Sequence, residues 1–222
     1  MFAAKLDGRD LAAEKKDSRR RMVADRVDDL LEAFIALRKD EKFVDWQLVI
    51  AGDGSPKYED SLKQIIRENN ASDSVLLTGW LDGEAKSRAL AGASVMALPS
   101  HHDAFGLCVI EAMAHGIPVL VGTQVGLAKE ILIGGAGWTS EVEISALSET
   151  LALILSDHDE RRRRGMAGRA LASKFDWQHV AEMLVRLYES IQPWRRPNTR
   201  TGEISVSEAQ RSTAATGQAR GA

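Results

Sequence analysis

The sequence predicts an α/β fold, a Rossmann-like parallel sheet with helices on both faces. Short apolar segments with the composition of buried strands recur at 46–51, 74–78, 94–98 and 117–121. Segments with apolar residues at helical spacing separate them, and glycine or proline stands at several of the junctions. Strands that alternate with helices in this way are typical of βαβ units, whose strands run parallel.

The first elements are a short strand and an amphipathic helix. Phe2–Leu6 predicts a strand that begins almost at the first residue, so we expect a further segment upstream of it. Residues 22–40 predict a helix with one apolar stripe, formed by Val23, Val27, Leu30, Leu31, Phe34 and Leu37. The strand at 46–51 ends at Gly52-Asp53-Gly54, which lacks the third glycine of a dinucleotide fingerprint and is weak evidence for NAD.

The middle of the chain continues the alternation. A helix at 58–69 and a strand at 74–78 lead to the turn Gly79-Trp80-Leu81. A short helix at 84–91 precedes the strand at 94–98. From Ile144 onward the sequence predicts helices, of which the last covers 177–191.

The rest of the chain is organised around residues 98–120. A strand ends at Leu98, a polar turn follows, and Phe105-Gly106 opens a helix that Gly116 and Pro118 end. We expect the backbone N–H groups of Phe105, Gly106 and Leu107 to be free at the helix start, where the helix dipole favours an anion. Such a helix start lies outside the carboxyl end of a strand, where ligands bind in open α/β sheets.

Two carboxylates bracket this helix start. Asp103 precedes it and Glu111 lies within the helix, with seven residues between them. Amide donors with two ionised acceptors suit a ligand that is phosphorylated and rich in hydroxyls, such as a nucleotide sugar. An ordinary βαβ crossover with surface acids would give the same pattern, and the residue types alone leave both interpretations open.

The segment Asp103–Val119, DAFGLCVIEAMAHGIPV, resembles the acid-x7-acid signature of retaining glycosyltransferases of the GT-B fold, group 1 (family four). The resemblance extends from about Phe2 to about Ile191 and covers the C-terminal, nucleotide-sugar-binding half of such an enzyme. It implies a single GT-B C-terminal domain over 1–191 and an acceptor-binding N-terminal half that this chain does not include. The composition of 192–222 predicts a disordered tail.

The resemblance also implies the roles of individual residues. Asp103 and Glu111 are the catalytic candidates. The donor-binding candidates are Lys5, Gly79, Trp80, Leu81, Asp103, Ala104, Phe105, Gly106, Leu107 and Glu111. Lys5 would meet the diphosphate, and Gly79-Trp80-Leu81 would lie beside the base, although Trp80 could equally be an aromatic side chain packed on the sheet. Asp103 is one methylene shorter than the usual Glu.

Composition limits the other classes of function. The net charge of −3 gives no electrostatic case for nucleic acid. The single cysteine, Cys108, excludes an intrachain disulfide and fits a reducing compartment. With no apolar run of transmembrane length and no leader pattern, we expect a cytoplasmic protein that could contact a membrane through its acceptor.

Histidine placement does not predict a metal site. His101 and His102 adjoin Asp103, but no further ligand follows at a recognised spacing. We therefore expect neither a metal nor a cofactor, and a UDP- or GDP-sugar as substrate.

The predicted function is that of the donor-binding half of a retaining glycosyltransferase, which needs a separate N-terminal acceptor half. The alternative is a non-catalytic nucleotide-sugar-binding module or subunit that acts through a partner. A third hypothesis is another enzyme of the same fold, such as a sugar-nucleotide epimerase.

Overall fold

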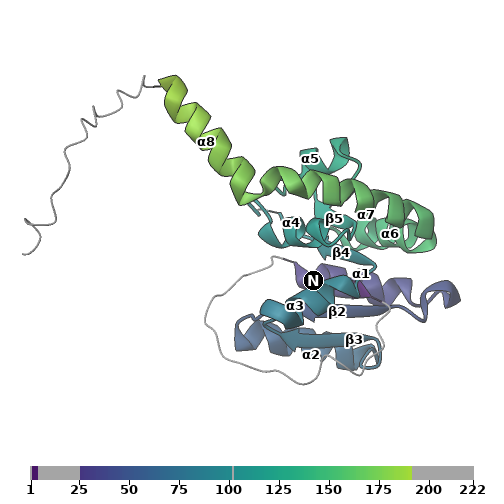
Figure 1. The fold of residues 1–222 in the computed structure, drawn as a ribbon. Helices are drawn as coiled ribbons and strands as arrows, with labels where there is room; N and C mark the ends of the chain where they lie inside the picture. Colours follow the sequence, from purple (N-terminus) through teal and green to yellow (C-terminus); the bar gives the residue numbers. More distant parts are fainter. Residues whose placement is uncertain (1, 5–25, 102, 192–222) are drawn as a thin grey trace, which may run out of the picture. The chain divides into compact units, whose positions relative to one another are not determined.

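The computed structural model describes residues 2–4, 26–101 and 103–191. The chain divides into two compact units, Met1–His179 and Val180–Ala222. The first unit contains the whole sheet and helices α1 to α7 (Figure 1). In the second unit the described residues belong to helix α8 (Trp177–Ile191), in which no residue is buried.

Six strands form one sheet in the described residues, in the order β3-β2-β1-β4-β5-β6. Their bounds are Phe2–Ala4 (β1), Gln47–Ala51 (β2), Val75–Gly79 (β3), Val95–Leu98 (β4), Val119–Gly122 (β5) and Gly137–Ser140 (β6). β2 runs parallel to β3, and β4, β5 and β6 run parallel to one another. All residues of β4 and β5 are buried, as expected for strands that are covered on both faces.

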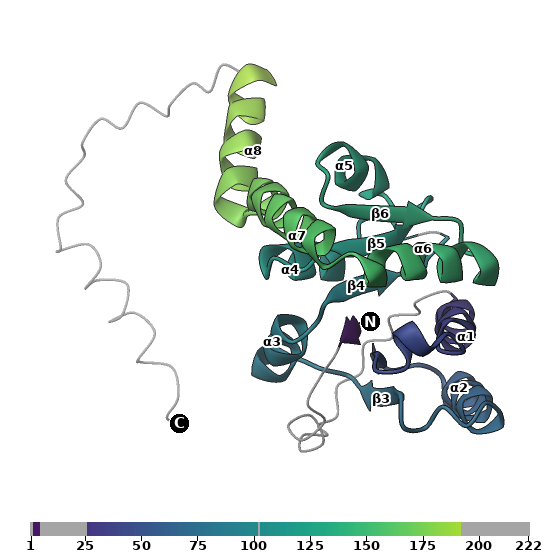
Figure 2. The ribbon, with the colours of Figure 1, turned by 90° about the vertical axis from the view of Figure 1, so that its right-hand side faces the viewer.

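Helices cover both faces of the sheet (Figures 1 and 2). The helices of the first unit are α1 (Val27–Leu37), α2 (Pro56–Glu68), α3 (Gly83–Ala91), α4 (Leu107–Ala114), α5 (Ala128–Ile133), α6 (Ile144–Ser156) and α7 (His158–Ala172). Two short 3₁₀ helices, η1 (Glu41–Phe43) and η2 (Ser173–Phe175), complete the elements.

The apolar core consists of two clusters, one on each face. Helices α1, α2 and α6 pack with Leu48, Ile50, Val95, Ala97 and Leu120. Helices α3, α4, α5 and α7 pack with the alternate strand residues Val49, Met96, Leu98, Val119 and Val121. This alternation follows from the period of two along a strand, which points successive side chains to opposite faces.

The predicted α/β class is confirmed, with one correction to the parallel sheet. β1 runs antiparallel to both β2 and β4, so it opposes the other strands at the centre of the sheet. Ala4 pairs with Gln47, at the amino end of β2. The next residue, Lys5, lies outside the described residues.

Two further predictions concern the ends of the chain. The proposed tail at 192–222 lies outside the described residues. Across the part of the chain that is described, no helix is both long enough and apolar enough to cross a membrane.

Candidate functional site

The loop that joins β4 to α4 lies against the loop that follows β5. The backbone N–H of Gly126 donates to the carbonyl oxygen of Asp103 at 2.9 Å. A Cβ atom at Gly126 would overlap the Ala104 carbonyl oxygen, and one at Gly122 would overlap the Ser100 carbonyl oxygen. Both glycines are therefore required for the close approach that positions the Asp103 loop.

The carboxylate of Asp103 binds its own loop. Its Oδ1 accepts hydrogen bonds from the backbone N–H of Phe105 at 2.9 Å and from that of Gly106 at 2.5 Å. The expectation of free amides at Phe105 and Gly106 is therefore wrong, because the short aspartate side chain reaches amides two and three residues ahead. The helix begins at Leu107, two residues later than expected, since Gly106 has a left-handed φ of 70°.

Leu107 retains the first N–H group of α4. No hydrogen bond joins this group to the residues that the structure describes, as is usual for the first turn of a helix. The Leu107 side chain is 69% exposed, so the start of α4 is open to solvent. The Phe105 ring, which is 45% exposed, packs edge-on against Phe175 with 5.9 Å between ring centroids.

Glu111 lies one turn further along α4 and is paired with a residue that sequence analysis did not single out. The Nζ atom of Lys86, on α3, lies 2.6 Å from Glu111 Oε1. The next residue on α3, Ser87, places its hydroxyl 3.1 Å from Nε2 of His115, the residue that follows α4. A lysine at this point of a short amphipathic helix carries no motif, so only the packing of α3 beside α4 shows its partner.

Asp103 and Glu111 both act on the thiol of Cys108. Burial raises the pKa of Cys108, and the negative charges of Asp103 and Glu111 raise it further. The thiol therefore stays protonated, as is typical of a structural cysteine rather than a nucleophile.

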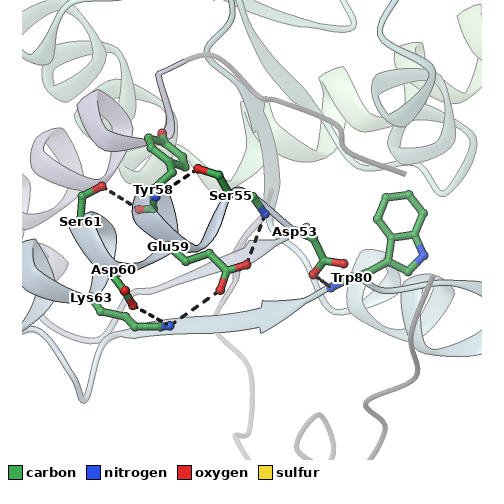
Figure 3. Close-up of polar contacts among 9 residues, drawn as sticks. Asp53, Ser55, Tyr58, Glu59, Asp60, Ser61, Lys63 and Trp80 are labelled. Carbon is green, nitrogen blue, oxygen red and sulfur yellow. Dashed lines mark hydrogen bonds and ion pairs between the residues drawn. The ribbon is translucent and has the colours of Figure 1, made fainter. Parts of the chain in front are cut away.

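The turn after β3 is tied to the turn after β2 (Figure 3). The Oδ1 atom of Asp53 accepts a hydrogen bond from the backbone N–H of Trp80 at 2.8 Å, and the N–H of Gly52 donates to the Gly79 carbonyl oxygen at 2.8 Å. Trp80 is partly buried, and its indole extends from the turn (Figure 3). Leu81 is buried in the core, so its side chain serves packing rather than ligand contact.

The turn after β2 is itself anchored to α2. The N–H of Gly54 donates to Glu59 Oε1 at 3.3 Å, and Ser55 caps the helix by accepting from the N–H of Tyr58 at 3.3 Å (Figure 3). Asp53 is therefore held in place to support Trp80. The Gly-Asp-Gly pattern of this turn is weak evidence for NAD, and the support that Asp53 gives to Trp80 was not predicted from the sequence.

The described residues include no group of three or more His, Cys, Asp or Glu side chains placed to hold a metal ion. His102, one of the two histidines beside Asp103, lies outside those residues.

Known proteins share sequence with this chain. A family model described as glycosyl transferases group 1 matches residues 20–171. An N-acetyl-alpha-D-glucosaminyl L-malate synthase of Bacillus anthracis is 33% identical over 168 residues, which cover 75% of this chain and 41% of that protein. A D-inositol 3-phosphate glycosyltransferase of Nocardia farcinica is 32% identical over 144 residues, covering 64% of this chain and 32% of that protein. The chain thus spans less than half the length of these relatives.

Solved structures resemble the fold. A sucrose-phosphate synthase from Thermosynechococcus elongatus aligns with a TM-score of 0.61 and 26% identity, covering 76% of this chain and 43% of that one. Anabaena Alr3699/HepE, solved in complex with UDP and glucose, aligns with a TM-score of 0.66 and 21% identity over 78% of this chain and 47% of that one. The C-terminal domain of a group 1 family protein (LpcC) from Francisella tularensis aligns with a TM-score of 0.60 and 22% identity, covering 70% of this chain and 81% of that one. The predicted GT-B fold is confirmed by this likeness.

Proposed function

Because this chain belongs to the group 1 glycosyl transferases, we propose that it is the donor-binding half of an enzyme that transfers a sugar from a nucleotide-sugar donor with retention of configuration. The observation that carries the proposal is the placement of the two acids at the start of α4: Asp103 binds the N–H groups directly before the helix, and Glu111 lies one turn into it. Leu107, whose N–H makes no hydrogen bond to the described residues, lies between the two acids in the sequence.

Each group has a proposed role in holding the donor. The start of α4, with the Leu107 N–H, binds the diphosphate, because a helix start offers amide donors and a favourable dipole. Asp103 uses Oδ1 to hold its loop, which leaves Oδ2 to accept a hydrogen bond from a hydroxyl of the donor sugar. Glu111 accepts from a ribose hydroxyl, and backbone groups of the turn at 79–81 contact the base.

The acceptor is supplied from outside this chain. Transfer requires an acceptor held beside the anomeric carbon, and such positioning accounts for much of an enzyme's rate. The relatives extend well beyond the length that this chain matches, which supports a separate acceptor-binding half. A UDP-sugar or a GDP-sugar is the proposed donor, with UDP favoured by the complex of the Anabaena neighbour. A cytoplasmic location belongs to the same proposal, on the grounds of the single cysteine.

Calorimetry on the full chain tests the proposal. We expect UDP or GDP, and at least one of their sugars, to bind at one site. Glu111→Gln should weaken binding about tenfold, since a neutral amide replaces an ionised acceptor while the shape is kept. Glu149→Gln on α6 is the matched control and should bind like the unchanged chain, because Glu149 is exposed on a helix of the other core cluster. A folded chain that binds none of these nucleotides would contradict the proposal.

A non-catalytic nucleotide-sugar-binding module remains the second candidate, since the chain matches under half of its relatives' length. Assays of hydrolysis and transfer, with and without an added acceptor-binding domain, separate the two. Transfer that appears only with that domain supports the donor half of an enzyme, whereas binding without turnover in either case supports the module.

A further inference from the structure

The ion pair between Lys86 and Glu111 joins two helices that flank the donor site. Lys86 stands on α3, before β4, and Glu111 stands on α4, after β4. Lys86 Nζ lies 2.6 Å from Oε1 of Glu111, and both side chains are about two-fifths exposed, 37% and 43%. The contact therefore lies at the surface where a ligand of Glu111 would arrive.

We infer that Lys86 is a positioning residue of the donor site, which fixes the Glu111 carboxylate through Oε1 and leaves Oε2 to a hydroxyl of the nucleotide. This inference rests on the proposed function of Glu111. A glutamate side chain on a helix surface samples several rotamers in the absence of a partner. Lys86 restricts it to one orientation before the ligand binds, which lowers the entropic cost of binding.

A second contact holds α3 in register with α4. The Ser87 hydroxyl lies 3.1 Å from His115 Nε2, and His115 Nδ1 lies 2.9 Å from the backbone oxygen of Glu111. Lys86 and Ser87 are adjacent, and their partners Glu111 and His115 are one helical turn apart. The two contacts therefore run side by side, and both join α3 to the C-terminal half of α4 and the residue that follows it.

Charge balance gives Lys86 a further effect at the same place. A diphosphate that approaches Asp103 and Glu111 meets two negative charges, and like charges a few ångströms apart repel even near the surface. Lys86 offsets the charge of Glu111. Arg88, two residues further along α3, pairs instead with Glu84 of its own helix at 2.7 Å. Arg88 thus has the same charge on the same helix without a link to α4.

The test measures UDP affinity by calorimetry on the full chain. Lys86→Ala should weaken binding about fivefold, Lys86→Arg should restore most of it, and Arg88→Ala should leave it unchanged. An ion pair this exposed contributes little to folding, so all three variants should keep the stability of the unchanged chain. Equal losses in Lys86→Ala and Arg88→Ala would overturn the inference, because they would show a general effect of charge.

A double-mutant cycle separates positioning from direct contact with phosphate. If Lys86 acts through Glu111, Lys86→Ala should have no further effect in a Glu111→Gln background. Additive losses would overturn the inference. A chain that binds UDP but is insensitive to Lys86→Ala would overturn this inference alone, whereas failure of the unchanged chain to bind any of the nucleotides would overturn the proposed function and this inference with it.

Discussion

The turns that follow strands β2 and β4 each contain an aspartate, and the two aspartates make different hydrogen bonds. Asp103, after β4, accepts hydrogen bonds from the N–H groups of Phe105 and Gly106 in its own loop. Asp53, after β2, accepts from the N–H of Trp80, which is 27 residues away after β3. The first aspartate shapes a local loop, and the second connects two turns that the sequence separates.

Each aspartate acts beside a glycine with left-handed backbone. Gly106 has φ 70° in the Asp103 loop, and Gly79 has φ 70° immediately before Trp80. A non-glycine residue is strained in this conformation, so each glycine lets the chain present its amides to the carboxylate. The Asp103 carboxylate therefore acts within its own loop, whereas the Asp53 carboxylate connects the turn predicted to lie beside the base to the turn after β2.

Gly126→Ala should have the largest effect, because it disrupts a close approach through which the loop after β5 supports the Asp103 loop. The added Cβ would overlap the Ala104 carbonyl oxygen, and the backbone of one loop must move. We expect a loss of about 2 kcal/mol in the free energy of unfolding, the typical result of forced overlap in packed structure. Urea denaturation measures this loss.

Thr123→Ala in the same loop is the control for Gly126→Ala. Thr123 is exposed, and its replacement should change the free energy of unfolding by less than about 0.5 kcal/mol. Equal stabilities of the two variants would show that the loop after β5 does not support the loop after β4.

Asp53→Ala should have the next largest effect. It removes the acceptor of the partly buried Trp80 N–H, and an unsatisfied donor in such a place costs about 1–2 kcal/mol. Asp53→Asn keeps an acceptor oxygen and should retain most of the stability. Hydrogen exchange at the Trp80 amide should quicken in Asp53→Ala and stay slow in Asp53→Asn. An unchanged exchange rate at the Trp80 amide in Asp53→Ala would contradict the connection between the two turns.

The sequence predicts the fold well because its signals are local. The strand at 94–98 is a short apolar segment, and the structure places β4 at Val95–Leu98. The helix at 107–114 ends where Gly116 and Pro118 predict, since glycine and proline act on the backbone of their own neighbourhood. The direction of β1 was predicted wrongly, because three residues of strand do not specify which way they pair.

The candidate site could be predicted only in part. The pair Asp103 and Glu111 follows from spacing on one loop and one helix. Lys86 could not be found in this way, because its partner depends on how α3 packs beside α4. Asp53 was missed for a similar reason, because the N–H group that donates to it belongs to Trp80, in the turn after another strand. Contacts between elements are set by tertiary packing, and one sequence carries no periodic signal for them.

Asp103→Ala should have the smallest effect on stability, and it tests the local side of the comparison directly. It releases the N–H groups of Phe105 and Gly106, but the loop lies at the surface, where water can replace the carboxylate oxygen. We expect a loss of about 0.5–1 kcal/mol, which is typical when a capping side chain is truncated. Amide exchange should quicken at Phe105 and Gly106 and stay unchanged at Trp80. Faster exchange at Trp80 as well would show that the two turns open together, and the distinction between a local loop and a strand-supported turn would then fail.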